Sequence, residues 1–403
     1  MRLSRANIST LEIPPGKSER IVFDDALPGF GIRLRAGGKR TWVVQYRVGT
    51  KHRRVTLANA ATLDPEEARK RAKDILAKAQ LGGDPQTEKM QARARAAVTL
   101  SGIATDYLKQ AEKRLRPTSY AEADRYLRRY LVPLHEMPAH AVSRRDVAGW
   151  VNEVAEQHGP HASNRGRTCL SALFSWAMRQ GLVELNPVVA TGKAVEETSR
   201  TRVLSREEIG QIWLACRDDD HGRIVRLLLL TGQRRNEVAG IRWSEIDRDA
   251  GLWRLPAERT KNGLPHDVPL SADALAILDG APVRNGKDLI FGDREGPFQG
   301  WSRAKISLDN RINESRVWFS GRNAVGISPW RLHDLRRTVV THMNENLGIL
   351  PHVVEAVVNH VTGPAKMGVA GVYNRASYAT EKKVALNSWS NYVTELIRTH
   401  REK

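Results

Sequence analysis

Cysteine is scarce in this 403-residue chain, which has only Cys169 and Cys216. Neither has metal-ligand spacing, and both lie in apolar helical stretches, so we interpret them as small core residues in a reducing compartment. CxxC, HExxH and phosphate-loop glycine motifs are absent. The sequence therefore gives no sign of a zinc site or an NTP-driven step, and we expect neither a metal nor a cofactor.

Long hydrophobic runs are missing as well. The opening stretch MRLSRANISTLEIPPGKSER has no apolar core of a signal peptide, and no run approaches transmembrane length. Lipidation signals and lysine-rich amphipathic helices are not found either. We expect a cytoplasmic protein without a membrane partner.

Positive charge is plentiful. The formal net charge is +19 and the pI is about 10.2. The basic residues recur along the whole chain, which favours an extended polyanion such as nucleic acid as the partner. A basic protein that is merely soluble is the alternative.

The first part of the chain predicts a small sheet followed by a helix. Between about residues 20 and 60, Trp42, Val44 and Tyr46 alternate with polar neighbours, as in a strand with two different faces. Asp64-Pro65 has the features of a helix start. Five arginines of the sheet are candidates for lining a DNA groove, with a solvated face as the alternative: Arg33, Arg35, Arg47, Arg53 and Arg54.

A helical block follows. The polar stretch 84–97 is interpreted as a linker, residues 98–190 have helical patterns throughout, and Gly192–Arg202 is interpreted as a second linker. Each basic residue of the block alone suggests only a surface charge, but together they suit a DNA-gripping module. These candidates are Lys109, Lys113, Arg125, Arg128, Arg129, Arg165 and Arg167.

The last part of the chain begins with a capping box at Ser205 and contains TGQRRNEV. Arg234 and Glu237 stand at i and i+3 in this motif, so they share a helix face. The plain interpretation is a helix-stabilising pair worth about 0.2–0.5 kcal/mol. Further on, the strands 252–255 and 266–270 flank Lys261-Asn262-Gly263, where Asn-Gly favours a tight hairpin turn. Lys261 then lies at the turn, either solvated or against a phosphate.

The stretch SPWRLHDLRR places His333 and Arg336 three residues apart, so both point to one spot if the stretch is helical. A solvated helix face is the alternative. His360, Tyr373 and Tyr378 come later, before an amphipathic helix over about 380–398. Two arginines, a lysine, two histidines and a tyrosine are the inventory for metal-independent covalent transfer of a DNA strand, because cations stabilise the phosphorane and a phenol attacks.

The ordered motifs TGQRRNEV, TK before Asn-Gly, HDLRR, VNH and GVYNR resemble those of the tyrosine recombinase (phage integrase) family, most closely its genomic-island and satellite-phage branch. The resemblance implies that Arg234 and Arg336 bind the scissile phosphate and that Glu237 orients this site. It also implies that Lys261 is the general acid for the leaving 5′-hydroxyl. It further assigns general acid/base work to His333, a phosphate hydrogen bond to His360 and the nucleophile to Tyr373. Family members often have Leu-Gly-His where this chain has Val-Asn-His, and Tyr378 is a rival nucleophile.

The resemblance predicts a mainly helical α+β protein with three domains: an arm-type DNA-binding domain (1–90), a helical core-binding domain (98–190) and a catalytic domain (203–403). The expected function is integration and excision of a mobile element through a 3′-phosphotyrosyl intermediate. The expected partners are double-stranded DNA with arm and core sites and further copies of the chain, as a tetramer on DNA. The C-terminal helix is a candidate for docking on a neighbour. Accessory DNA-bending or directionality factors stay open. A type IB-like topoisomerase and an inactive DNA-binding architectural protein are the alternatives.

Overall fold

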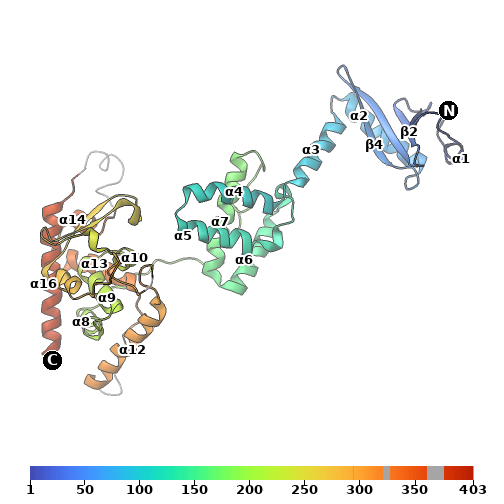
Figure 1. Cartoon of the computed structure of the whole chain (residues 1–403). Coiled ribbons are helices and arrows are strands. Elements are labelled where there is room, and N and C mark those ends of the chain that lie inside the picture. Colours follow the sequence, from blue (N-terminus) through green and yellow to red (C-terminus); the bar gives the residue numbers. More distant parts are fainter. Residues whose placement is uncertain (294, 321–326, 361–375, 403) are drawn as a thin grey trace. The chain divides into compact units, whose positions relative to one another are not determined.

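The computed structural model describes residues 1–293, 295–320, 327–360 and 376–402. The chain divides into two compact units, Met1–Thr198 and Ser199–Lys403. Among the described residues, helices dominate both units, and each unit contains a small antiparallel sheet (Figure 1). The predicted mainly helical α+β class is confirmed.

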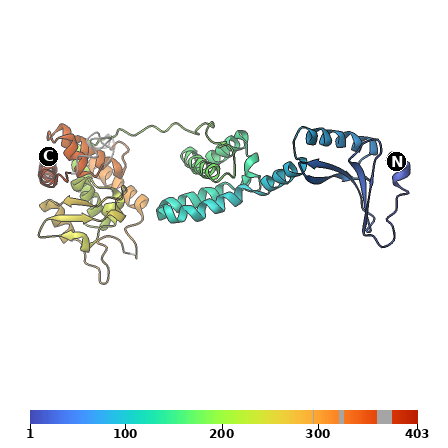
Figure 2. The same ribbon diagram turned by 90° about the horizontal axis from the view of Figure 1, so that it is seen from above.

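The first unit begins with an antiparallel sheet in the order β1-β2-β3-β4, as the alternating pattern predicts. Its elements are α1 (Arg5–Ile8), β1 (Glu19–Phe23), β2 (Phe30–Arg35), β3 (Arg40–Val48), β4 (Lys51–Asn59) and α2 (Pro65–Gln80). Asp64 starts α2 by accepting a 3.0 Å hydrogen bond from the backbone N–H of Glu66. The buried face of the sheet, with Phe30 stacked on Trp42, packs against α2 (Figure 2).

The sheet's arginines do not all lie on one face. Arg54 is paired with Gln45 across β3 and β4, whereas Arg53 is paired with the buried Tyr46. Because successive strand residues point to opposite faces, Arg54 lies on the open face and Arg53 on the face that α2 covers. The same alternation places Arg33, Arg35 and Arg47 on the open face.

The stretch predicted to be a linker is instead the helix α3 (Pro85–Ala97). Asp84 starts it, and the Tyr46 hydroxyl donates a 2.8 Å hydrogen bond to that carboxylate. None of the residues of α3 is buried. The sequence pattern does not predict this helix because a helix that is polar on every side has no apolar periodicity, while its alanines, glutamines and arginines have high helix propensity. Its role as a linker stays a prediction.

The rest of the first unit is helical, as predicted. It comprises α4 (Leu100–Arg114), α5 (Pro117–Asp124), η1 (Arg125–Tyr130), η2 (Val132–Leu134), η3 (Ala139–Ala141), α6 (Arg144–His158) and α7 (Pro160–Arg179). The predicted capping box at Ser143 starts α6. Residues 192–202 contain neither helix nor strand, in keeping with the predicted linker.

The second unit combines helices with a three-stranded sheet in the order β5-β6-β7 (Figure 1). Its described elements up to the sheet's last strand are α8 (Arg206–Ala215), α9 (Asp220–Thr231), α10 (Arg235–Ala239), η4 (Trp243–Glu245), β5 (Ile246–Asp247), β6 (Leu252–Leu255), η5 (Ala257–Arg259) and β7 (His266–Pro269). The helices described after this strand are α11 (Ala272–Asp279), α12 (Trp301–Ser320), α13 (Leu332–Glu345), α14 (Pro351–Val357) and α16 (Ala379–Arg401).

The connection between β6 and β7 differs from the tight hairpin that Asn-Gly favours. It spans residues 256–265, includes η5, and turns at Thr260–Gly263, where the N–H of Gly263 donates to the Thr260 carbonyl at 3.4 Å. Gly263 has a φ of +73°, but Asn262 is not among the residues with positive φ. A two-residue type I′ turn needs positive φ at both central residues, so the turn at these residues is not of that type.

The C-terminal helix α16 packs on its own unit. Leu386, Trp389 and Val393 are buried, and the indole N–H of Trp389 donates a 2.7 Å hydrogen bond to the carbonyl of Leu229 in α9. These contacts are those of one copy of the chain, so the docking of this helix on a neighbouring copy stays a prediction.

Candidate active site

The site begins where the buried helix α9 ends. Gly232 has a left-handed conformation, with a φ of +66°. A Cβ atom at Gly232 would lie only 3.1 Å from Cγ1 of Val339 in α13 and 3.3 Å from Cγ1 of Val358, next to α14. Glycine is needed both for the backbone turn and for this close approach. The approach brings the ends of α9 and α14 against α13.

Arg234 follows directly and is held by Glu237. The guanidinium donates to the Glu237 carboxylate through Nη1 at 2.9 Å, and the backbone N–H of Arg234 donates to the other carboxylate oxygen at 3.0 Å. Glu237 is buried and Arg234 is half-buried. The predicted contact between Arg234 and Glu237 therefore exists. It fixes the orientation of the Arg234 side chain and is not a solvent-exposed pair on a helix surface.

Arg336 is buried in α13 between two segments. Its Nη1 donates to the carbonyl of Gly232 at 2.8 Å, and its Nη2 donates to the carbonyl of Val358. Burial, followed by the nearby positive charge of Arg234, lowers the pKa of Arg336 to about 10, so it stays charged at neutral pH. Two like charges are thus held together, an arrangement that favours an anionic ligand.

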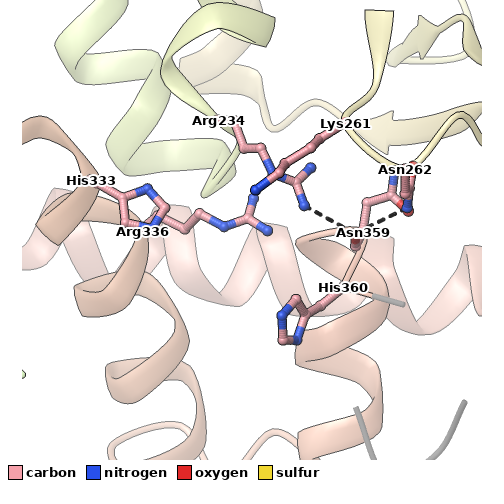
Figure 3. Close-up of a pocket in the computed structure, with 7 residues that line it drawn as sticks. All are labelled: Arg234, Lys261, Asn262, His333, Arg336, Asn359 and His360. Atoms are coloured by element: carbon pink, nitrogen blue, oxygen red, sulfur yellow. Dashed lines mark hydrogen bonds between the residues drawn. The ribbon is translucent and has the colours of Figure 1, made fainter. Parts of the chain in front are cut away.

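His333 precedes Arg336 by one helical turn at the start of α13, on the same side of the pocket (Figure 3). Desolvation lowers the pKa of His333, and the charges of Arg337 and Arg336 lower it further. The imidazole is therefore neutral at pH 7, the form that accepts a proton.

Two loops complete the site. Lys261 extends from the β6–β7 connection, and His360 follows α14 after Asn359. Asn262 donates through Nδ2 to Oδ1 of Asn359 at 2.9 Å, which joins the two loops. The carbonyl of Asn359 also accepts from Nη2 of Arg234 at 3.4 Å.

These side chains line a pocket of about 370 Å³ (Figure 3). Its lining residues are Arg234, Lys261, Asn262, His333, Arg336, Asn359 and His360. They come from separate segments, and no carboxylate is among the described residues that line the pocket. Cations, imidazoles and amides with no competing acid suit one phosphate group.

The structure brings together five of the predicted catalytic side chains and places Glu237 behind Arg234. Tyr373 lies outside the described residues. Its rival Tyr378 precedes α16, where its ring lies 5.2 Å from that of His352, and it does not line the pocket.

The sequence reasoning missed Asn262 and Asn359 as members of the site. In the sequence, Asn262 indicates only a turn, and Asn359 stands out only as a departure from the family's Leu-Gly-His. That departure was the available signal, because a polar side chain at a usual glycine position can make contacts that glycine cannot.

The helical candidates for DNA binding are placed on the surface or in local contacts. Lys109 is exposed, Arg128 pairs with Asp124, and Arg165 lies 3.7 Å from Glu122. Arg167 instead donates to the carbonyls of Val188 and Thr191, and so holds the loop after α7.

The described residues offer neither a metal site nor a membrane span. They hold no group of three or more histidine, cysteine, aspartate or glutamate side chains arranged to bind a metal ion. None of the described helices combines the length and apolar composition that a bilayer crossing requires.

Family models match three consecutive parts of the chain. The arm DNA-binding domain matches residues 3–92, the phage integrase central domain 100–194, and the phage integrase family 202–376. Among curated relatives, the prophage integrase IntA of Escherichia coli strain K12 is 28% identical, covering 93% of this chain and 92% of its own. The integrase of Enterobacteria phage P4 is 26% identical, covering 71% of this chain and 69% of its own.

Solved structures share the fold. A lambda integrase tetramer bound to a Holliday junction matches with a TM-score of 0.52 at 19% identity, covering 86% of this chain and 99% of that one. The Tn1549 transposon integrase in complex with circular intermediate DNA matches with a TM-score of 0.51 at 16% identity, covering 70% and 96%.

Proposed function

Because the chain belongs to the phage integrase family of tyrosine recombinases, we propose that the pocket of Figure 3 binds the scissile phosphate of a DNA strand. The protein is a site-specific DNA recombinase. We assign it the integration and excision of a mobile genetic element, as in the genomic-island and satellite-phage branch. The observation that carries the assignment is the convergence of Arg234, Arg336 and His333 on one pocket without a carboxylate.

The proposed cleavage step is an in-line displacement at phosphorus. The Tyr373 oxygen attacks and forms the 3′-phosphotyrosyl bond while the bond to O5′ breaks. His333 accepts the phenol proton, and Lys261 donates a proton to O5′. Arg234, Arg336 and His360 stabilise the negative charge that grows on the non-bridging oxygens. Rejoining runs through the same steps in reverse, so no nucleotide cofactor is consumed.

The proposed division of labour follows three domains. Residues 1–90 bind arm sites, and 98–190 and 203–403 bind the core site. Lambda integrase forms a tetramer on a Holliday junction, and we propose the same assembly state for this chain on DNA. The two cysteines are unpaired thiols, in keeping with a cytoplasmic place of action.

A nicked suicide duplex that carries the core site tests the chemistry. The wild-type protein should form a covalent adduct with DNA, Tyr373→Phe should form none, and Tyr378→Phe should retain it. An adduct that persists in Tyr373→Phe overturns the nucleophile assignment. DNA binding without any adduct in the wild type favours an inactive architectural protein, and relaxation of plasmids without a core site favours a topoisomerase.

A further inference from the structure

The loop that carries Lys261 has few attachments. Gly263, Leu264 and Pro265 are exposed. Within residues 261–265, the hydrogen bonds to distant described residues are those of Asn262 with Asn359, 97 residues away. The connection is anchored just before these residues, where Thr260 is buried and Arg259 donates to the carbonyl of Glu237 at 2.6 Å. The pairing therefore holds the outer part of the loop, residues 261–265, against the pocket.

The partner residue has an unusual backbone. Asn359 has a φ of +50°, in the left-handed region of backbone conformation that few residues other than glycine and asparagine adopt. In this conformation its side-chain oxygen meets Asn262, while its carbonyl accepts from both Asn262 and Arg234 at 3.4 Å. A glycine would adopt the same backbone more easily but would lose the amide, which suggests that the asparagine is there for its contact.

The contact connects two catalytic groups. Asn262 is the neighbour of Lys261 in the chain, and Asn359 is bonded to Arg234 and precedes His360. Figure 3 shows the two amides meeting at one edge of the pocket, beside Lys261 and Arg234. Through Asn359, the loop that carries Lys261 is therefore connected by hydrogen bonds to Arg234, one of the cations that we propose to bind the phosphate.

We propose that the Asn262–Asn359 pair is a positioning clasp that holds the β6–β7 loop where Lys261 protonates the leaving O5′. The inference rests on the proposed function and assigns neither asparagine a direct part in bond breaking. A general acid acts only within hydrogen-bond reach of its acceptor, and a lysine on a loose loop spends less time there.

A sulfur substitution in the substrate separates positioning of the acid from other defects. In a duplex whose scissile O5′ is replaced by sulfur, the phosphorus–sulfur bond breaks and a thiolate leaves. A thiol has a pKa of about 8.5, so the thiolate departs without a proton from Lys261. Variants that only misplace the acid should cleave this substrate normally.

The experiment compares Asn262→Ala, Asn359→Gly and the double variant in the full-length protein on both substrates. Glycine at 359 suits the positive φ, so the fold is retained. On the oxygen substrate we expect each single variant to cleave roughly 10- to 100-fold more slowly, within the range of a general acid's contribution. On the sulfur substrate we expect rates close to the wild type.

The double variant should be no slower than the worse single variant, because both single changes remove the same contact. Asn391→Ala, at an exposed asparagine of α16, is the matched control and should behave as the wild type on both substrates. Lys261→Ala should cleave the oxygen substrate slowly and the sulfur substrate at a rate close to the wild type. Arg234→Lys should cleave both substrates slowly.

Each result has a separate meaning. The clasp is overturned if the sulfur substrate rescues Lys261→Ala but not the asparagine variants. It is also overturned if the asparagine variants cleave the oxygen substrate at the wild-type rate. Failure of sulfur to rescue Lys261→Ala removes the acid that the clasp is meant to position, and overturns the clasp as well. If the wild type forms no adduct on either substrate, the proposed recombinase chemistry itself is wrong.

Discussion

Glu237 grips Arg234 at two points, accepting from its guanidinium at 2.9 Å and from its backbone N–H at 3.0 Å. The carboxylate is buried, so the pair is shielded from water on the side away from the pocket. One acidic residue thereby starts the short helix α10 and aims the arginine that we propose to bind phosphate.

Replacing the carboxylate of Glu237 tests whether this residue orients Arg234 toward the pocket. Glu237→Gln keeps the shape and one oxygen acceptor but removes the charge and one of the two hydrogen bonds. We expect DNA binding to change little and cleavage of the suicide duplex to slow by up to about 10²-fold, the cost of a misplacement near 1 Å. Single-turnover rates at saturating protein give the answer, and an unchanged rate would mean that Arg234 is held by other contacts.

Arg336 offers a test of the forked cation. Arg336→Lys keeps a positive charge but cannot reach the carbonyls of Gly232 and Val358 while also facing the pocket. We expect cleavage to fall by about 10²–10³-fold, as for the loss of one preorganised donor to a transition state. Arg303→Lys, at an exposed arginine of α12, is the control for a general effect of lysine. Equal cleavage by both variants would contradict the role of Arg336.

His266 predicts how the stability of the second unit depends on pH. Burial, followed by the charge of Lys382, lowers the pKa of His266 from 6.5 to about 3, and the ring is 3.0 Å from the carbonyl of Val357. Below pH 6.5 the imidazole of His266 binds a proton in the unfolded chain but stays neutral in the folded chain until the pH approaches 3. Stability therefore falls as the pH drops from about 6.5 toward 3, by about 2 kcal/mol at pH 5 from this group.

The measurement is pulsed hydrogen exchange of the β7 peptide after equilibration in urea at each pH. In His266→Gln the urea midpoint should depend less steeply on pH between 6.5 and 4 than in the wild type. His221 and His342, whose pKa values are also lowered by burial, retain part of the dependence. Identical slopes in the two proteins would show that His266 is not protected from protons.

The open face of the N-terminal sheet predicts a salt-dependent DNA interaction. Alanine at Arg35, Arg47 and Arg54 should weaken arm-site binding and reduce the slope of log affinity against log salt by up to about 3, near 0.9 for each phosphate that is no longer neutralised by an arginine. The control removes the equally charged exposed trio Lys70, Arg71 and Lys73 from α2. Titrations at several salt concentrations compare the two, and a larger effect of the α2 trio would place the interface on the helix instead.

Local spacing made much of the site predictable. His333 and Arg336 share one turn of α13, as helical spacing predicts. Arg234 and Glu237 are in contact, but Arg234 is the extended N-cap residue of α10, so the contact is a capping interaction and not a shared helix face. Their convergence on one pocket is a property of the whole unit, and it could be expected only through the resemblance to a family. The Asn262–Asn359 contact joins positions 97 residues apart, which no periodicity reveals.

The errors have the same physical origin. The helix α3 buries none of its residues, so it lacks the pattern by which helices are found. The β6–β7 turn was predicted from Asn-Gly alone, although the side chain of Asn262 is engaged with Asn359 rather than shaping a tight hairpin. In both cases a local signal was weaker than contacts or propensities that the pattern does not show.

The bond from Trp389 to Leu229 has a consequence for how the enzyme is made. Leu229 lies in the helix that ends just before Arg234, and Leu386, Trp389 and Val393 complete the core around that helix. During translation the ribosome delivers Arg234 long before it delivers these residues. The core around the pocket therefore stays incomplete until α16 emerges, and we expect the pocket to form only after the last helix has been made.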